Sequence, residues 1–187
     1  FTKIVGEQII KDYCKANLSL NTIALRYFNP IGAHESAHIG ELPIGTPQNL
    51  VPYVTQTAVG IREKLSVFGN DYPTYDGTCI RDYIDVVDLS KAHVIAMIRL
   101  FEEKNNDNIE AFNIGTGKGS SVLEVINTFQ KISGVQLNYF FTERREGDVS
   151  IAYADTQKAN RTLGWKSDRT LEDALKSAWK WQKSIQK

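Results

Sequence analysis

Apolar residues recur along the chain at two spacings, one typical of helices and one typical of strands. Between Lys3 and Asn17 they return at helical spacing, which predicts an amphipathic helix. The same spacing over residues 50–61 predicts a second helix, and a mostly apolar stretch up to about Glu103 predicts a third, with Asp88 as its cap. Short apolar runs between these helices predict strands at residues 20–28, 65–68, 80–86, 111–114 and 137–141.

The remaining segments continue this alternation. Ser121 and Glu124 have the spacing of a capping box, which predicts a helix that starts there. Residues 151–154 should be extended, and Thr170 should begin a final helix. Residues 29–47 are rich in Gly and Pro and are predicted to form a long loop. Strands that alternate with helices in this way predict an α/β fold.

The composition indicates a globular protein with a small-molecule ligand. With 187 residues, 42% of them hydrophobic, the chain can bury a sizeable core. Lys plus Arg and Asp plus Glu both total 22, so no overall field attracts nucleic acid or a membrane. Cys14 and Cys79 lack the spacing of a metal site, and no apolar run is long enough to span a bilayer. We therefore predict a cytoplasmic protein that holds a small anion by local geometry.

The tract from Arg26 to Gly32 is the first candidate for a ligand site. It combines the end of a predicted strand, an aromatic residue, an amide and a chain reversal. This combination suits the crevice at the carboxyl ends of parallel strands, where α/β proteins bind their ligands. Taken alone, the tract also fits a packed strand that ends in an ordinary turn.

Several tracts together resemble one family. They are Arg26–Gly32, Phe68–Thr74, Asp76–Ile84 and Arg144–Asp148. They are similar to the extended short-chain dehydrogenase/reductases and, within these, to the UDP-glucose 4-epimerases, over almost the whole chain. The resemblance implies the C-terminal part of an extended fold, with the edge of an NAD-binding Rossmann domain and a smaller α/β substrate-binding domain. Residues 1–29 and 80–104 would be remnants of the Rossmann domain, and residues 30–79 and 105–187 would form the UDP-sugar-binding domain.

The resemblance also implies an isomerase that uses tightly held NAD to interconvert UDP-glucose and UDP-galactose at C4. Lys3 matches the Lys of the family's catalytic Tyr and Lys, so the Tyr would lie two positions before Phe1, outside the chain. Lys3 would lower the pKa of that phenol and hold the nicotinamide ribose, and Phe28 would lie against the nicotinamide.

Without that Tyr and a Gly-rich NAD loop, the chain alone is expected to be inactive. A non-catalytic UDP-sugar-binding module therefore remains an alternative function. Members of the family are commonly homodimers, so the resemblance also implies a homodimer.

The resemblance assigns the sugar nucleotide to residues from several segments. Arg81 and Arg145 would clamp the pyrophosphate, because guanidinium groups donate paired hydrogen bonds to phosphate oxygens. Without the resemblance, each would be interpreted as a surface ion pair with the acidic residue that follows it. Asp148 would accept hydrogen bonds from the ribose hydroxyls. The remaining contacts would come from Asn29, from Asn49 and Leu50 at a helix start, and from Ser66, Val67 and Phe68 beside the uracil.

Ala152 occupies a position that lines the sugar pocket in the resembled family. A small side chain there leaves room for a 2-acetamido group. We therefore hypothesise that UDP-GlcNAc and UDP-GalNAc, the N-acetylated UDP-hexosamines, are also substrates. The alternative is that alanine simply suits the local packing.

Two further motifs point to other functions. His34-Glu35-Ser36-Ala37-His38 matches the H-E-x-x-H pattern of zinc hydrolases, which needs a helix to bring both imidazoles to one face. Surrounding Gly and Pro residues oppose a helix, so a zinc hydrolase is the weaker alternative and no metal is expected. The run Gly115–Ser120 lies between a strand and a helix, like a dinucleotide-binding loop, but its glycine spacing does not fit. It is interpreted as a tight turn into a capped helix.

Overall fold

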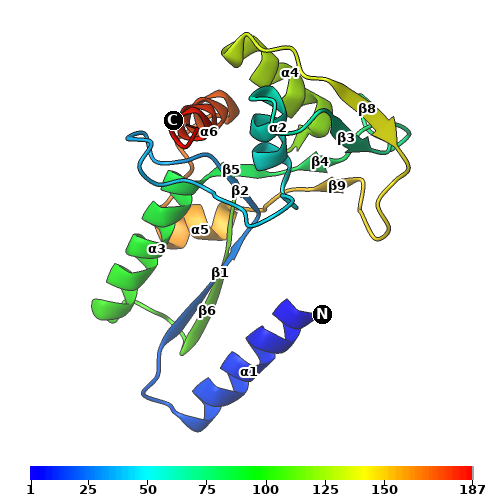
Figure 1. Cartoon of the computed structure of the whole chain (residues 1–187). Coiled ribbons are helices and arrows are strands. Elements are labelled where there is room, and N and C mark those ends of the chain that lie inside the picture. Colours follow the sequence, from blue (N-terminus) through cyan, green and yellow to red (C-terminus); the bar gives the residue numbers. More distant parts are fainter. Residues whose placement is uncertain (187) are drawn as a thin grey trace.

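Helices and strands alternate along residues 1–186, the part of the chain that the computed structural model describes (Figure 1). The helices are α1 (Thr2–Ala16), α2 (Leu50–Ala58), α3 (Val86–Phe101), α4 (Val122–Ser133), α5 (Gln157–Thr162) and α6 (Leu171–Ser184). The strands are β1 (Thr22–Tyr27), β2 (Asn29–Ile31), β3 (Leu65–Phe68), β4 (Ile80–Arg81), β5 (Tyr83–Asp85), β6 (Ile109–Ile114), β7 (Ser120–Ser121), β8 (Tyr139–Thr142) and β9 (Ile151–Ala152). This order confirms the predicted α/β fold.

The strands form small, mostly parallel sheets. β1 pairs with β6 in parallel, from Thr22 opposite Ile109 to Tyr27 opposite Ile114. β2 pairs with β5, and β3 pairs with β8, both in parallel. In the remaining sheet, β4 lies between β9, to which it is parallel, and β7, to which it is antiparallel. The carboxyl ends of parallel strands are where α/β folds hold their ligands.

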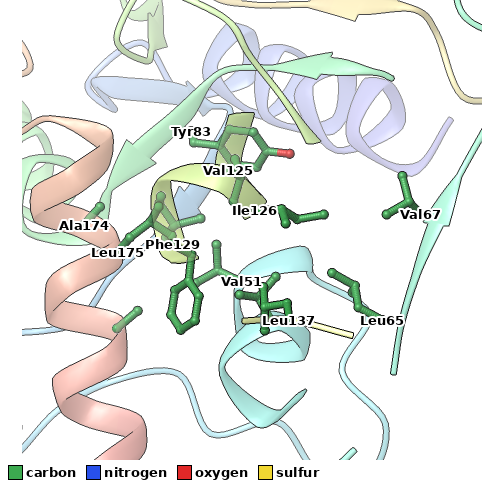
Figure 2. Close-up of a cluster of buried hydrophobic side chains, with 13 residues drawn as sticks. Val51, Leu65, Val67, Tyr83, Val125, Ile126, Phe129, Leu137, Ala174 and Leu175 are labelled. Carbon is green, nitrogen blue, oxygen red and sulfur yellow. The ribbon is translucent and has the colours of Figure 1, made fainter. Parts of the chain in front are cut away.

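One hydrophobic core lies between α2, α4, α6 and β3 (Figure 2). Phe129 of α4 and Leu175 of α6 are fully buried in it. Each such side chain stabilises the fold by about 1.5–3 kcal/mol relative to an exposed one. On β3, Leu65 and Val67 face this core, whereas the residues between and after them are more exposed. Strand β3 thus has one buried face and one outer face, as the two-residue period of a strand requires.

A second buried cluster joins the β1 and β6 pair to α3 and α5. Its members include Phe112 of β6, Leu89 of α3, Ala159 of α5 and the nearby Trp165. The predicted division placed residues 105–187 in the substrate-binding unit, whereas β6 and α5 pack in this cluster. The packing therefore groups β6 and α5 differently, and the division into domains stays a prediction.

Helix α1 has an apolar face that is largely exposed. Ile4, Ile9 and Tyr13 are 73%, 64% and 60% exposed, whereas Cys14 is buried beside Thr22 of β1. Figure 1 shows α1 at the opposite end of the molecule from α2, α4 and α6. The helix is amphipathic, as predicted, but its apolar face belongs to neither core. None of the helices formed by residues 1–186 combines the length and apolar character needed to cross a membrane.

Among the predictions of single helices, strands and loops, some are confirmed and others are wrong. The capping box is confirmed, because Ser121 Oγ accepts from Glu124 N at 2.9 Å and the Glu124 carboxylate accepts from Ser121 N at 3.3 Å. Residues 29–47, predicted to form a long loop, instead begin with β2. Its Pro30 is tolerated because a proline can lie in a strand where its nitrogen is not needed as a donor. The strand predicted at residues 80–86 is interrupted at Asp82, which separates β4 from β5.

Helix α3 is capped by a different aspartate from the one predicted. Asp85 is its N-cap, and Asp85 Oδ1 accepts from Val87 N at 2.8 Å. Asp88 is fully buried in the first turn and anchors a distant segment. Its Oδ2 accepts from Asp168 N and Arg169 N, both at 2.8 Å, and its carbonyl oxygen accepts from Trp165 Nε1 at 3.1 Å. Burial alone would raise the pKa of Asp88, but the donors to its carboxylate, chiefly the N–H groups of Arg169 and Asp168, outweigh burial and hold the pKa below its usual value.

Asp88→Asn is expected to lower the free energy of unfolding by about 1.5–3 kcal/mol near pH 7, because an amide accepts from the two N–H groups less strongly than a carboxylate does. A lowered folded-state pKa stabilises the fold above the unfolded value, near 3.9, and this contribution is lost as the pH falls through the folded pKa. Urea unfolding of both proteins near pH 7 and near pH 3 should show the difference shrink in acid. An equal difference at both pH values would contradict this role.

Candidate functional site

A cavity of about 490 Å³ lies between the start of α2, strands β2 to β5 and the segment that follows β8. Separate segments of the chain supply its walls, so only the folded protein brings them together. Its lining includes nine of the residues that sequence analysis assigned to the sugar nucleotide, namely Asn29, Asn49, Leu50, Ser66, Val67, Phe68, Arg81, Arg145 and Asp148.

Strand alternation explains one wall of the cavity. Cys79, Arg81 and Tyr83 are two residues apart and all line it. Asp82 lies between them, is fully buried, and faces the other way. Its Oδ1 accepts from Thr116 N at 2.8 Å and Thr116 Oγ1 at 2.7 Å, while its Oδ2 accepts from the N–H groups of Gly117 and Ala154, both at 3.1 Å. Arg81 and Tyr83 therefore line the cavity, whereas Asp82 between them stabilises the fold.

The guanidinium group of Arg81 is held in a defined position. Its Nη1 donates to the carbonyl oxygen of Ile80 at 2.9 Å, and its Nη2 lies 3.4 Å from Asp148 Oδ1. The Arg81 side chain is 16% exposed and that of Asp148 is 34% exposed. The ion pair thus links two cavity residues and does not join Arg81 to Asp82, so the simple surface-pair interpretation of Arg81 is wrong.

The two consecutive arginines after β8 have different environments. Arg144 Nε donates to Asp71 Oδ1 at 2.7 Å, which lowers the pKa of the Asp71 carboxyl. The Arg144 guanidinium also lies 4.3 Å from the centre of the Tyr72 ring. Arg145 instead lines the cavity, with its guanidinium 4.5 Å from the centre of the Phe68 ring. A guanidinium group over an aromatic face keeps its N–H groups, which lie in the guanidinium plane, available to a ligand.

Tyr83 is an aromatic wall residue that sequence analysis did not assign to the site. Burial raises the pKa of its phenol, although the charge of Arg81 acts in the opposite direction. Tyr83 is therefore a neutral phenol at physiological pH and is not suited to act as a base. Cys79 and Tyr53 were also missed. The two-residue spacing from Arg81 could have identified Cys79 and Tyr83, whereas Tyr53 follows only from the position of α2.

The amino end of α2 meets the cavity at Asn49 and Leu50. Asn49 is the N-cap residue and has the extended backbone typical of that position, but its side chain does not cap the helix. Instead, Asn49 Nδ2 donates to Glu41 Oε1 at 2.8 Å. The amino end of a helix carries partial positive charge and favours a bound phosphate, so it complements the two arginines.

Lys3, Phe28 and Ala152 do not line this cavity. Lys3 is exposed in the first turn of α1. Phe28 is partly buried between β1 and β2, where its N–H donates to the carbonyl oxygen of Ile114 at 3.1 Å. Ala152 lies directly beside Arg81 in the register of β4 and β9, so its Cβ is on the same face of the sheet. Phe28 thus directly precedes the lining residue Asn29, and Ala152 is paired with the lining residue Arg81, whereas Lys3 lies on α1.

The two other motifs do not form the sites that their patterns suggest. Residues 35–38 form turns and bends with Ala37 at a positive φ of 57°, and His34 Nδ1 is 2.8 Å from Ser36 Oγ. Within residues 1–186, no group of His, Cys, Asp and Glu side chains gathers as a metal site. In the Gly115–Ser120 loop, the N–H groups of Thr116 and Gly117 are bonded to Asp82, so they are not available to a phosphate. The interpretation of this loop as a turn into a capped helix is confirmed.

The fold, with its parallel strand pairs and the cavity beside them, is that of the extended short-chain dehydrogenase/reductases, as the likeness to solved structures shows. Solved structures have the same fold. The UDP-glucose 4-epimerase of Stenotrophomonas maltophila, with bound NAD and formylated UDP-arabinopyranose, gives a TM-score of 0.94 with 46% identity, over 99% of this chain and 54% of that chain. The Bifidobacterium longum UDP-glucose 4-epimerase, in complex with NAD+ and UDP, gives a TM-score of 0.90 with 45% identity, over 97% of this chain and 53% of that chain.

The family follows from the sequence. The family model described as GDP-mannose 4,6 dehydratase matches residues 1–178, so the chain belongs to that family. Within it, the chain is similar to UDP-glucose 4-epimerases such as that of Bacillus subtilis, with 51% identity over 98% of this chain and 53% of the relative. The chain thus spans about half the length of the curated relatives that it matches.

Proposed function

We propose that the complete protein carrying this chain interconverts UDP-glucose and UDP-galactose with NAD as its cofactor, and that this chain supplies the UDP-sugar pocket. The main observation in support is that Arg81 and Arg145, from distant segments, line one cavity beside the amino end of α2. Two positive groups and a helix amino end match the charge of a diphosphate. The similar epimerases with bound UDP or a UDP-sugar support the same ligand class.

The geometry supports a definite orientation of the sugar nucleotide. The diphosphate would lie between Arg81 and Arg145, with Asn29, Asn49 and Leu50 at its sides. The uracil would rest along Ser66, Val67 and Phe68, which form one continuous wall of the cavity. Asp148, already oriented by Arg81, would accept from the ribose hydroxyls. Tyr83 would contribute a neutral aromatic surface and no base.

The residues present fit only one end of NAD. Phe28 follows the carboxyl end of β1, where a nicotinamide would rest in this fold, and Lys3 would hold the adjoining ribose. The cofactor would supply reversible hydride transfer at C4 of the sugar. The Gly115–Ser120 loop offers no second site for its pyrophosphate, because the loop donates to Asp82. The chain's own residues thus bind and orient the sugar nucleotide.

Two measurements test this function. Titration calorimetry of the chain with UDP should show saturable binding, and the complete protein with NAD should convert UDP-galactose to UDP-glucose. If the chain does not bind UDP at millimolar concentration, the pocket assignment is wrong. If the chain binds UDP but the complete protein has no epimerase activity, the non-catalytic UDP-sugar-binding module becomes the correct function.

Ala152→Tyr is expected to lower the turnover of UDP-GlcNAc by the complete protein about tenfold or more, with UDP-galactose turnover changed by less than about threefold. Ala152 lies beside Arg81 on the pocket face of β9, so a large side chain there takes the space of a 2-acetamido group. Ala152→Ser is the matched control and should retain both activities. Equal loss for both sugars, or no loss for either, would contradict the proposed gate.

A further inference from the structure

The loop that precedes α2 is fastened to helix α6 by side chains that point toward it. Lys180 Nζ donates to the carbonyl oxygen of Glu35 at 2.6 Å. Ser184 Oγ lies 3.2 Å from that of Ala37 and shares its one proton between it and the nearer carbonyl oxygen of Trp181, at 2.7 Å. Trp181 Nε1 donates to the carbonyl oxygen of Glu41 at 2.9 Å. These three side chains are one helical turn or less apart, so a single face of α6 fixes the loop.

Gly40 strengthens this attachment. A Cβ at Gly40 would collide with the indole of Trp181, so the loop backbone lies directly on the ring. The position of Glu41 is therefore set by α6 through its own carbonyl group and through the residue before it. Its carboxylate is left free to act on another group.

That group is the side chain of Asn49. Asn49 lines both the candidate cavity and a neighbouring, mainly apolar cavity of about 450 Å³ that Glu41 also lines. An asparagine at an N-cap ordinarily accepts from the N–H of the second or third helical residue. In α2 the third residue is Pro52, which has no N–H, and Asn49 Oδ1 makes no bond to the second residue either. Asn49 Nδ2 instead donates to Glu41 Oε1 at 2.8 Å, which directs the amide away from the helix.

We propose that Glu41 is a positioning residue: it draws the Asn49 side chain away from the first turn of α2 and so leaves the amino end of the helix open to the ligand's phosphate. Trp181 acts indirectly, because it fixes the position of the Glu41 backbone. Without Glu41, the Asn49 amide would be free to turn its Oδ1 toward the N–H of Val51 and to cover the amino end of α2 that the phosphate approaches. This inference rests on the proposed function and specifies how the phosphate-binding side of its pocket is kept open.

The test is UDP binding to the chain, measured by calorimetry with thermal unfolding in parallel. Glu41→Ala should weaken UDP binding about fivefold, the factor that corresponds to one N-cap bond. It should not lower the midpoint of thermal unfolding, because the released Asn49 gains a cap. Glu41→Gln keeps an oxygen that accepts from Asn49 Nδ2 and should restore the affinity to within about twofold. Glu35→Ala, in the same loop with its side chain 76% exposed, is the matched control and should bind like the unmodified chain.

A double-mutant cycle decides whether Glu41 acts through Asn49. In an Asn49→Ala background, Glu41→Ala should cause no further loss, so the two effects should not add. Uridine, which has no phosphate, should bind equally to the unmodified chain and to Glu41→Ala. Additive losses, tighter binding by Glu41→Ala, or an affinity loss matched by a lower unfolding midpoint would each overturn the positioning role. If the unmodified chain binds no UDP, the proposed function itself fails, and that result is distinct from all of these.

Discussion

Replacing Asp82 with alanine should lower the free energy of unfolding by about 4 kcal/mol. The Asp82 carboxylate is fully buried and accepts four hydrogen bonds, three of them from the N–H groups of Thr116, Gly117 and Ala154. Removing it leaves those N–H groups without an acceptor, and each unsatisfied buried group costs about 1–3 kcal/mol. Alanine cannot recover this loss by packing, because the site is lined by polar backbone.

Urea unfolding of the two proteins measures this effect. The free energy of unfolding of Asp82→Asn should lie between those of the unmodified protein and of Asp82→Ala. The amide retains one acceptor oxygen but turns an NH2 group toward another donor. Asp107→Ala is the control, since Asp107 is an exposed residue in the turn before β6, and it should change the free energy of unfolding by less than about 0.5 kcal/mol. A change below about 1 kcal/mol for Asp82→Ala would mean that the Gly115–Ser120 loop does not depend on Asp82.

Removing either guanidinium group of the cavity should weaken UDP binding about tenfold to a hundredfold. A charge-assisted hydrogen bond contributes about 1.5–3 kcal/mol, and a guanidinium group can donate two to a diphosphate. Arg81→Ala also releases Asp148, whose uncompensated charge would then repel the ligand. The double variant with Arg145→Ala should bind UDP about a thousandfold more weakly, although the two effects need not add fully because both groups contact one ligand.

The adjacent arginine provides the control for this prediction. Arg144→Ala removes the same charge one residue away, but Arg144 is engaged by Asp71 and Tyr72, so UDP affinity should change by less than about threefold. Uridine should bind Arg145→Ala as it binds the unmodified protein, because it has no diphosphate and Arg145 makes no ion pair with Asp148. Equal losses for Arg144→Ala and Arg145→Ala would show that only the overall charge matters, and the proposed clamp would be wrong.

Strong local signals made parts of the fold predictable. The limits of β3 were predicted correctly because its apolar run is short and bounded by polar residues, and the Ser121 capping box was predicted from two residue types at fixed spacing. The cap of α3 was missed because Asp85 and Asp88 are equally good candidates by residue type. Only the end of β5 and the approach of residues 165–169 decide between them, and both are tertiary features.

The functional site was likewise predictable only where its residues belong to local motifs. Motif resemblance identified nine residues that line one cavity, yet their roles stay predictions. Strand alternation could have added Cys79 and Tyr83 to the set. Glu41 could not have been found, because its contact with Asn49 depends on how α6 holds an irregular loop. Sequence patterns report local periodicity well and loop positions poorly, and this loop supplies the contact that orients Asn49.

The consecutive pair Arg144 and Arg145 constrains how this protein can change during evolution. Arg144 is held by its hydrogen bond to Asp71, and Arg145 lies over the Phe68 ring in the cavity. An insertion or deletion of one residue between β8 and Arg144 would move both arginines by one place along the chain, so that a glutamate would take one of the two positions. Lineages of this protein should therefore vary in the chemistry of that segment while keeping its length constant.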